Sequence, residues 1–450
     1  MQLLCLASRW IFFAALFVPP WLYGGTTATG IVITNWILAA AVVAWLLELV
    51  LNRRKPDLPL PLLLLCAALA LIGLWMTFNA KAIYDQDFGT FAIIEHPVAQ
   101  APGSLDYALS AASMIRVVLL LLSILFVVDL VQDDKALLQL WAVIALSGGS
   151  IALLGLVQKA TGAQTIFWQT PSVGYTQNFF ATYYYHANAG AYLNLILPFT
   201  AGLALRAFGT RSGAGLRTLW LTTFLLGLGA AAANTSRMAH ATAFLILIAL
   251  VVRFGPRIVR DLSRSEKNVM LAGAAAVLFM MFAIGRASHL ERPLKRWENI
   301  GEHVSADARW SASRIAAQSL SDAGLIGFGP GTFRAIFPSI NAGADHPVPG
   351  EWRFLHQDYL QTALEWGWLG SALWAALFFG GIGVSINTLR KPEAREWRWR
   401  RRVILPMSIF ALFGVALHAL VDFPWQIASI QLYSATCLGL CWGSARWRSR

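Results

Sequence analysis

The residues best suited to chemistry are concentrated in one polar stretch, residues 287–356, of a chain that is otherwise mostly apolar. A guanidinium group binds two phosphate oxygens at once, and an imidazole accepts a proton near neutral pH. The stretch therefore has the residue types needed for anion binding and for general base catalysis. Among its residues are Arg309, Arg314, Arg334, Arg353, His289, His303, His346 and His356.

His356 is the strongest candidate for a general base, because it stands where the polar stretch runs into a long apolar segment. Tyr359, Gln361 and Glu365 follow it and make an unusually polar beginning for an apolar helix. In this position a histidine commonly caps a helix or faces lipid headgroups. We favour catalysis by His356 and substrate contacts from the three residues after it, because polar groups at membrane depth are costly. Glu365 fits a structural ion pair equally well.

Three arginines are candidates for holding an anion. Arg237 begins an apolar segment from the side where topology disfavours positive charge, so its presence requires a reason. The alternative for Arg237 is a side chain that reaches phospholipid headgroups. Arg309 and Arg314 lie on a predicted amphipathic helix, residues 306–323, where a solvated helix face is the alternative.

Two further polar residues lie at the ends of apolar segments. Asn188 is near the start of one segment, and Asp422 lies between the last two. Each could line the same cavity as His356, or could serve structure alone as a helix cap or a partner in an ion pair. We include both among the predicted substrate-binding residues.

Other kinds of site are not supported by the spacing of the motifs. The glycine-rich turn, residues 327–331, lacks the preceding strand of a dinucleotide-binding motif. It is predicted to let the chain fold back tightly, with Phe333 packing beneath it. The histidines are too scattered for a zinc site, and the four cysteines all lie in apolar segments, so no metal ligands are predicted.

The composition indicates a membrane protein. The 450 residues are 57% apolar and 13% charged, whereas soluble domains have about 45–50% and about 25%. Apolar runs of ~20 residues, long enough to cross a ~30 Å hydrocarbon core, recur along the chain. We therefore predict an all-α polytopic membrane protein with about 12 transmembrane helices and one long loop that contains short helices. The predicted spans are 9–25, 31–51, 59–77, 111–131, 136–157, 186–206, 216–233, 238–253, 268–285, 358–386, 403–421 and 424–443.

The net charge of +12 helps to fix topology rather than indicating nucleic-acid binding. Lys and Arg lie mostly in short loops, and with twelve spans these clusters fall on one side, together with both termini. That side is predicted to be cytoplasmic, and the long loop lies on the other side. The predicted parts are therefore transmembrane helices 1–9 in residues 1–285, the loop in 286–357, and helices 10–12 with a cytoplasmic C-terminus in 358–450. The first apolar run has no small-residue cleavage site, so we predict a span rather than a signal peptide.

Several motifs taken together resemble the O-antigen ligase and polymerase superfamily. They are Ser236-Arg237, the spacing from Arg309 to Gly327, the Gly-x-Gly-x-Gly-x-Phe turn, and His356-x-x-Tyr359-Leu360-Gln361-x-x-x-Glu365-x-Gly367-x-x-Gly370. Each motif is loose alone, but their order and the position of the long loop make the combination fairly specific. Two departures are Gln357, where many relatives have asparagine, and Ala323-Gly324, where a proline is usual.

This resemblance implies an inverting, metal-independent glycosyltransferase of the GT-C type that uses no cofactor. Such enzymes transfer a glycan from undecaprenyl diphosphate to an acceptor sugar at the periplasmic face of the bacterial inner membrane. By the resemblance, Arg237 and Arg309 hold the diphosphate, and His356 is the essential loop histidine. The expected partners are the lipid-linked glycan donor, a lipid A core or glycan acceptor, and the bilayer, with no nucleic acid.

Alternatives remain open at this point. A ligase and a polymerase share the donor chemistry and differ in the acceptor, which the sequence does not specify. A transporter or flippase of lipid-linked oligosaccharides is the rival from another class. It would be favoured by symmetric halves with discontinuous helices near mid-membrane, whereas this chain gathers its polar residues in one loop.

Overall fold

The computed structural model describes residues 2–447 except 86, 89, 95–97, 99, 170–177, 211, 264–307 and 392–398. The described chain is helical apart from one two-stranded hairpin, and it confirms the predicted all-α polytopic fold. Ten of the described helices are long and apolar enough to cross a membrane. Nine of them are α1 (Gln2–Trp21), α2 (Ala28–Leu51), α3 (Leu60–Phe78), α4 (Tyr107–Leu130), α5 (Asp134–Ala160), α6 (His186–Gly209), α7 (Ala214–Ala233), α8 (Arg237–Ser263) and α15 (Asp358–Arg390).

The tenth candidate span combines a short helical turn, Arg400–Ile404, with α16 (Leu405–His418). The last predicted span corresponds to α17 (Ala428–Gly443), which has 16 residues and is almost wholly buried. The predicted span 268–285 and the predicted domain boundary at 286 lie outside the described residues.

Local sequence signals determine where several helices begin. Thr27, Asp106 and Asp133 precede α2, α4 and α5, and each side chain accepts a hydrogen bond from a backbone N–H in the first turn. Capping of this kind satisfies donors that have no partner within the helix. The helices then continue through apolar runs, whose backbone polar groups must be paired internally within a bilayer.

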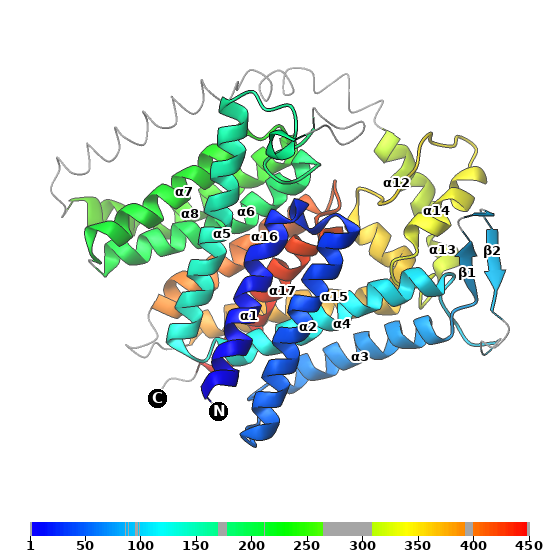
Figure 1. Ribbon diagram of the computed structural model, residues 1–450, viewed down its shortest axis with the longest axis horizontal. Coiled ribbons are helices and arrows are strands. Elements are labelled where there is room, and N and C mark those ends of the chain that lie inside the picture. The colour runs from blue at the N-terminus through cyan, green and yellow to red at the C-terminus, as the bar shows by residue number, and fades with distance from the viewer. Residues whose placement is uncertain are drawn as a thin grey trace.

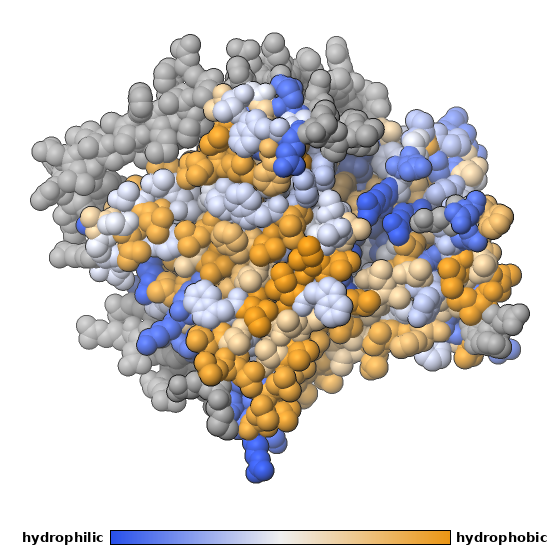
Figure 2. All heavy atoms as spheres, viewed as in Figure 1, coloured by the Kyte–Doolittle hydropathy of each residue, from blue (hydrophilic) through white to orange (hydrophobic). Residues whose placement is uncertain are grey.

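α17 lies at the centre of the bundle and contacts α1, α4, α6, α15 and α16. Around it, α1 packs on α2 and α5, and α6 packs on α7, α8 and α16 (Figure 1). Large apolar side chains such as Trp36, Val50 and Phe78 remain exposed on the outer helices. Figure 2 shows the resulting hydrophobic surface over α1–α4, as expected for helices that face lipid tails.

A smaller lobe packs against the beginning of α15. We call residues 308–357 the loop lobe; it contains α12 (Ala308–Gln318), α13 (Leu320–Ala323) and α14 (Phe333–Ala342). Its own core includes Ile315, Phe333, Phe337 and Leu355. Beside it, β1 (Ala82–Asp85) and β2 (Thr90–Ile93) form an antiparallel hairpin in which Ala82 pairs with Ile93.

The prediction of one continuous helix over 306–323 was wrong. The helix is interrupted at Ser319, and the part before residue 308 lies outside the described residues. Ala312, Ile315 and Ala316 form its buried face. The break lets the second helix, α13, turn toward α15 and contact it.

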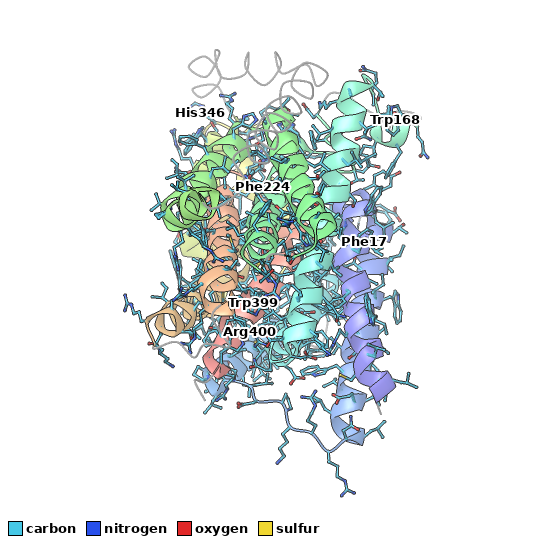
Figure 3. The ribbon with its side chains drawn as sticks, turned by 90° about the vertical axis from the view of Figure 1, so that its left-hand side faces the viewer. Phe17, Trp168, Phe224, His346, Trp399 and Arg400 are labelled. Atoms are coloured by element: carbon cyan, nitrogen blue, oxygen red, sulfur yellow. The ribbon has the colours of Figure 1, made fainter. Side chains whose placement is uncertain are left out.

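The two ends of the molecule differ in content. Both termini lie close together at the lower edge of Figure 1, and we call this the terminal end. Figure 3 places Trp399 and Arg400 toward the same lower end, and His346 of the loop lobe near the upper end. We call the upper end the loop end. The residues predicted to carry chemistry are associated with the loop end.

Candidate active site

His356 lies at the junction between the loop lobe and α15. The next residue, Gln357, caps α15 by accepting a hydrogen bond from the backbone N–H of Leu360. His356 itself has a φ of 60°, in the left-handed region that non-glycine residues rarely adopt. Such a conformation costs about 1–3 kcal/mol and persists only where the surrounding structure enforces it. The backbone strain therefore falls on the residue predicted to be the base.

The imidazole of His356 is paired with Asp422. His356 Nδ1 lies 3.0 Å from Asp422 Oδ1, although the two residues are 66 positions apart in the sequence. The His356 side chain is 20% exposed and that of Asp422 only 5%. Because an ionised carboxylate can only accept hydrogen bonds, Nδ1 carries a proton, and in the neutral imidazole Nε2 is then the nitrogen with a free lone pair.

Asp422 is held in its ionised form. Burial acts to raise its pKa, but the hydrogen bond and charge of His356, together with the charge of Arg309, lower the pKa below its ordinary value. The charge of His418 acts in the same direction. A charged Asp422 would stabilise a positive charge that develops on His356 when the imidazole takes up a proton.

Tyr185 connects this pair to an arginine. The Tyr185 hydroxyl donates to Asp422 Oδ2 at 3.2 Å, and Arg309 Nη2 donates to the Tyr185 oxygen at 3.0 Å. Burial and the charge of Asp422 raise the pKa of Tyr185, so its hydroxyl stays protonated and available as a donor. The network thus joins the N-terminus of α6, α12 of the loop lobe and the turn between α16 and α17.

Aromatic rings surround the imidazole. Phe423 meets the His356 ring edge-on with 4.6 Å between centroids, and Trp352 and Tyr185 each lie at 6.0 Å. Phe354 stacks on Phe423 at 4.9 Å. These contacts restrict the orientation of the imidazole and exclude water from part of its surface.

The turn that carries Asp422 is clamped to α15. Asp358, the first residue of α15, accepts hydrogen bonds from the Trp425 backbone N–H at 2.8 Å and from Gln426 Nε2 at 3.0 Å. Its own backbone N–H donates to the Ala419 carbonyl at 3.0 Å. Asp358 therefore sets the position of residues 419–427 relative to His356. The sequence offered one signal for it, a carboxylate at the first position of an apolar helix.

Glu365 binds the backbone of the glycine-rich turn. It accepts hydrogen bonds from the backbone N–H groups of Gly331 and Phe333, at 3.0 and 3.2 Å. Gln361 Nε2 donates to it at 3.0 Å, and the Gln361 side-chain oxygen accepts from the Leu355 N–H. Both side chains are buried, so their recorded hydrogen bonds fix the loop lobe on α15.

Tyr359 also uses its hydroxyl within the protein, where it donates to the Ala416 carbonyl at 2.8 Å. The substrate contacts predicted for Tyr359, Gln361 and Glu365 stay a prediction. Their recorded partners are protein groups that hold α15, the loop lobe and α16 together.

The glycine-rich turn folds back tightly, as its sequence predicts. Gly327, Gly329 and Gly331 all have positive φ. A Cβ added at Gly327 would lie 2.4 Å from the Gly367 nitrogen, and one at Gly329 would lie 2.2 Å from Ser104 Oγ. The Phe328 and Gly329 N–H groups donate to carbonyls of α15, both at 2.9 Å. Only glycine permits this approach between the turn, α15 and the segment before α4.

Arg237 is positioned by the turn before α8. Asn234 Nδ2 donates to the His186 carbonyl at 2.8 Å, and its Oδ1 accepts from the Ser236 N–H at 2.7 Å. These bonds attach the start of α8 to the start of α6, beside Tyr185. Arg237 is partly buried, and no hydrogen bond or ion pair is recorded for it within the described part of the chain.

Asn188 and Arg314, the two other predicted substrate-binding residues, lie in different environments. Asn188 is buried in the first turn of α6, and its Oδ1 has no hydrogen-bond partner among the described residues. Arg314 is exposed on α12, away from the buried Ala312, Ile315 and Ala316. The structure therefore gathers His356, Arg309 and Asp422, with Asn188 and Arg237 on the adjoining helices, and leaves Arg314 outside this network.

Tyr185 is the functional candidate that the sequence did not single out. It is the last of three consecutive tyrosines at the start of an apolar segment, just before His186 and Asn188. That polar and aromatic cluster was the available signal. The described residues contain no group of three or more His, Cys, Asp and Glu arranged to hold a metal ion.

Comparison with known proteins places the central part of this site in a family. Residues 222–375 match the family model for O-antigen ligase, Wzy_C. No curated protein matches the chain. The matched segment extends from α7 to the first half of α15, and it includes Arg237, Arg309 and His356 but not Tyr185 or Asp422. The match confirms, over residues 222–375 of this membrane protein, the resemblance to the O-antigen ligase and polymerase superfamily.

Proposed function

We propose that the protein is a glycosyltransferase that moves a glycan from undecaprenyl diphosphate to an acceptor sugar at the periplasmic face of the bacterial inner membrane. In this proposal the loop end faces the periplasm and the terminal end faces the cytoplasm. The catalytic loop is residues 286–357. The observation that carries the proposal is the hydrogen-bonded series His356–Asp422–Tyr185–Arg309 within and beside an O-antigen ligase domain.

His356 acts as the general base. Its Nε2 takes the proton of the acceptor hydroxyl while Asp422 holds Nδ1 and stabilises the imidazolium that forms. Tyr185 fixes the second oxygen of Asp422, so the carboxylate cannot rotate away from the imidazole. The aromatic contacts to His356 keep the ring in the same orientation.

The diphosphate lies toward Arg309 and Arg237. Arg309 already reaches the network through Tyr185, and Arg237 begins α8 next to the first turn of α6. The N-termini of α6 and α8 carry partial positive charge that adds to that of the arginines. Together these groups would stabilise the negative charge that develops on the departing diphosphate. The amide of Asn188, whose oxygen has no hydrogen-bond partner among the described residues, would contact the glycan.

The reaction is a single displacement. The acceptor oxygen attacks the anomeric carbon of the donor sugar, its proton passes to His356, and the bond from that carbon to the phosphate oxygen breaks. Undecaprenyl diphosphate leaves with the bonding electrons, and the configuration at the anomeric carbon inverts. Because arginines carry the charge stabilisation, the proposed mechanism uses no metal ion.

The test replaces His356 by alanine in cells that lack the wild-type gene, with His346→Ala as a matched control. His346 is an exposed histidine of the same loop lobe with no recorded contact to the network. We expect His356→Ala to abolish the surface glycan and to leave the lipid-linked donor on the periplasmic side, whereas His346→Ala has the wild-type pattern. Normal glycan in the His356→Ala cells would contradict the assigned role.

The intermediate that accumulates separates the versions of the function. Long chains on the carrier identify a ligase, and single repeats identify a polymerase. Donor trapped on the cytoplasmic side would instead identify a transporter or flippase of lipid-linked oligosaccharides, and the proposed transfer reaction would then be rejected.

A further inference from the structure

The β1–β2 hairpin exposes large apolar side chains although it lies outside the spanning helices. Phe88 in its turn is 80% exposed, and Ile93 at the end of β2 is 85% exposed. Phe91, which lies on the same face of β2 as Ile93, is exposed as well. An apolar patch of this kind marks a surface that contacts a membrane or another protein. The hairpin is therefore a candidate contact surface.

The base of the hairpin is fixed to the end of a spanning helix. Asn79, which follows α3, is buried, and its Nδ2 donates to the carbonyls of Ala101 and Pro102, both at 3.0 Å. Its Oδ1 accepts from the Val98 N–H at 2.6 Å. α3 has 19 residues, which corresponds to a length of about 28 Å and is close to the thickness of a hydrocarbon core. The hairpin thus begins where the span leaves that core.

Aromatic side chains mark the same level of the molecule. Phe78, the last residue of α3, is 77% exposed, and Trp75 one turn earlier is also exposed. Tyr107 begins α4, which packs against α3, and its side chain is exposed too. Trp and Tyr are enriched where helices leave the hydrocarbon core. Figure 2 shows the hydrophobic surface of these helices continuing toward the hairpin.

The hairpin turn also has a polar side. Asp85 Oδ1 accepts from the N–H groups of Asp87 and Phe88, at 2.9 and 3.3 Å. Asp87 is exposed directly beside Phe88. At a bilayer surface, carboxylates stay in water while neighbouring aromatic side chains enter the boundary between headgroups and acyl chains. This mixture of side chains fits the surface of a bilayer better than its hydrocarbon core.

Hydrogen bonds connect the hairpin to the glycine-rich turn through the segment before α4. The Tyr84 N–H donates to Asp106 Oδ2 at 2.7 Å, and the Leu105 N–H donates to the Phe328 carbonyl at 2.9 Å. The Phe328 N–H in turn donates to the Leu364 carbonyl of α15 at 2.9 Å. These bonds couple the position of the hairpin to that of the turn and of α15.

We propose that the β1–β2 hairpin lies in the surface of the bilayer at the loop end, with Phe88 and Ile93 at the boundary between headgroups and acyl chains. This contact sets the depth of the loop lobe relative to the headgroups. The positioning role rests on the proposed function, in which the diphosphate of the lipid-linked donor lies at that depth, whereas the membrane contact does not. A second copy of the chain is the other apolar occupant, and the test separates the two.

Fluorescence quenching in liposomes measures the membrane contact. The dye NBD is attached to the full chain at Phe88→Cys or Ile93→Cys, and His346→Cys, at an exposed position of the loop lobe, is the matched control. The signal of labelled wild type, which has four native cysteines, is subtracted. We expect lipids with a nitroxide near the start of the acyl chain to quench both hairpin labels at least about threefold more than the control label. Aqueous iodide should quench the control label most.

The accessible surface of the labels decides the outcome. Iodide quenching of the hairpin labels that equals the quenching of the control label would overturn the proposal. Nanodiscs that hold a single copy of the chain exclude contacts between copies. Labels that are shielded from iodide in liposomes but not in these nanodiscs would identify a second copy as the occupant and would also overturn the proposal. Shielding in both supports the bilayer.

The positioning role is tested by the combined substitution Phe88→Ser and Ile93→Ser. We expect the donor KM in liposomes to rise about fivefold with kcat near the wild-type value, because the loop lobe is no longer held at the depth of the diphosphate. In detergent micelles, which offer no planar interface, the wild type and the variant should have the same donor KM. Equal KM values in liposomes, or an equal rise in micelles, would reject the positioning role. If the wild type transfers no glycan, the proposed function fails, and the quenching result still decides the membrane contact.

Discussion

The two ends of the molecule treat their charged residues in opposite ways. At the terminal end, four arginines are paired with carboxylates. Arg54 lies 2.6 Å from Asp129 and 2.8 Å from Glu48, Arg9 lies 3.0 Å from Asp133, Arg446 lies 2.9 Å from Asp57, and Arg400 pairs with Asp134. At the loop end, no ion pair is recorded among the described residues for Arg116, Arg237, Arg334 or Arg353, although the charge of Glu365 acts on Arg116 and that of Asp106 acts on Arg334.

This difference separates structural charge from functional charge. A matched arginine at a helix end helps fix neighbouring helices, and its removal leaves a carboxylate uncompensated. An arginine without an ion pair that is partly buried in a membrane protein, such as Arg116 or Arg237, adds a desolvation cost to the folded state. Its retention is explained when a ligand supplies the missing negative charge. This difference supports the binding site that we propose at the loop end, whereas the recorded pairs at the terminal end connect neighbouring helices.

Among substitutions that test the difference between the two ends, we expect the largest effect, a loss of kcat, from Asp422→Asn at the loop end. The amide can donate to His356 Nδ1, which leaves the proton on Nε2 and removes the base. We expect kcat to fall about 10²–10⁴-fold, with both KM values near those of the wild type. Single-substrate titrations in liposomes measure this. A kcat within about threefold of the wild type would remove Asp422 from the mechanism.

At the terminal end, Arg54→Ala should affect stability rather than catalysis. It leaves Glu48, whose side chain is 6% exposed, and Asp129 without their cation. We expect the free energy of unfolding to fall by about 2 kcal/mol, between the values for exposed and buried pairs. Denaturant titration in detergent measures it.

Arg353→Ala is the control for this prediction, because no ion pair is recorded for Arg353 in the described chain. We expect its free energy of unfolding to change by less than about 0.5 kcal/mol. Equal losses from the two substitutions would contradict the distinction between the ends.

A smaller effect is expected in the pH dependence of stability. The pKa of Asp422 in the folded protein is below its ordinary value of about 3.9. Its stabilising contribution is therefore complete above that value and is lost as the pH falls through the folded-state pKa. The Tm difference between wild type and Asp422→Asn should be constant above pH ~5 and should shrink toward pH 3. A difference that grows on acidification would show that Asp422 is not held ionised.

The smallest effect is expected on metal removal. If arginines stabilise the leaving diphosphate, EDTA should leave the transfer rate unchanged within error. The matched test adds Mg²⁺ back at millimolar concentration. Loss of transfer in EDTA with recovery in Mg²⁺ would move part of the charge stabilisation from the arginines to a metal ion.

Much of the fold follows from the sequence, because a membrane requires long apolar helices. Most of the spans from α1 to α8 and α15 were predicted within a few residues for this reason, but α1 begins at Gln2 rather than at residue 9, and α8 continues to Ser263 rather than ending at residue 253. The last span was predicted as 424–443, but α17 begins at Ala428, since Pro424–Gln426 form a separate turn held by Asp358. That boundary depends on a hydrogen bond across 67 residues, which no local pattern contains.

Part of the candidate site could likewise be predicted from the sequence, and part could not. His356, Arg309 and Asp422 were selected because each is a polar residue where an apolar segment begins or ends. Tyr185 was not selected, since a tyrosine at a helix end usually anchors at the membrane interface. Its role appears only when α6, α12 and the 419–427 turn meet in three dimensions.

Other long-range contacts were also not predicted. Gln361 and Glu365 bind the Leu355, Gly331 and Phe333 backbone, and their predicted contact with substrate stays a prediction. A buried carboxylate beside a glycine-rich turn satisfies free N–H groups as well as it would bind a ligand. Sequence alone does not distinguish these two uses.

The central claim is that His356 removes the proton of the acceptor hydroxyl. A single-turnover experiment tests it, with purified undecaprenyl-diphosphate-linked glycan in liposomes and equal amounts of folded wild type and His356→Ala. We expect the wild type to release undecaprenyl diphosphate and form the glycosylated acceptor, and the variant to bind the donor with similar affinity but transfer it at least about 100-fold more slowly. Transfer by His356→Ala at the wild-type rate would contradict the account.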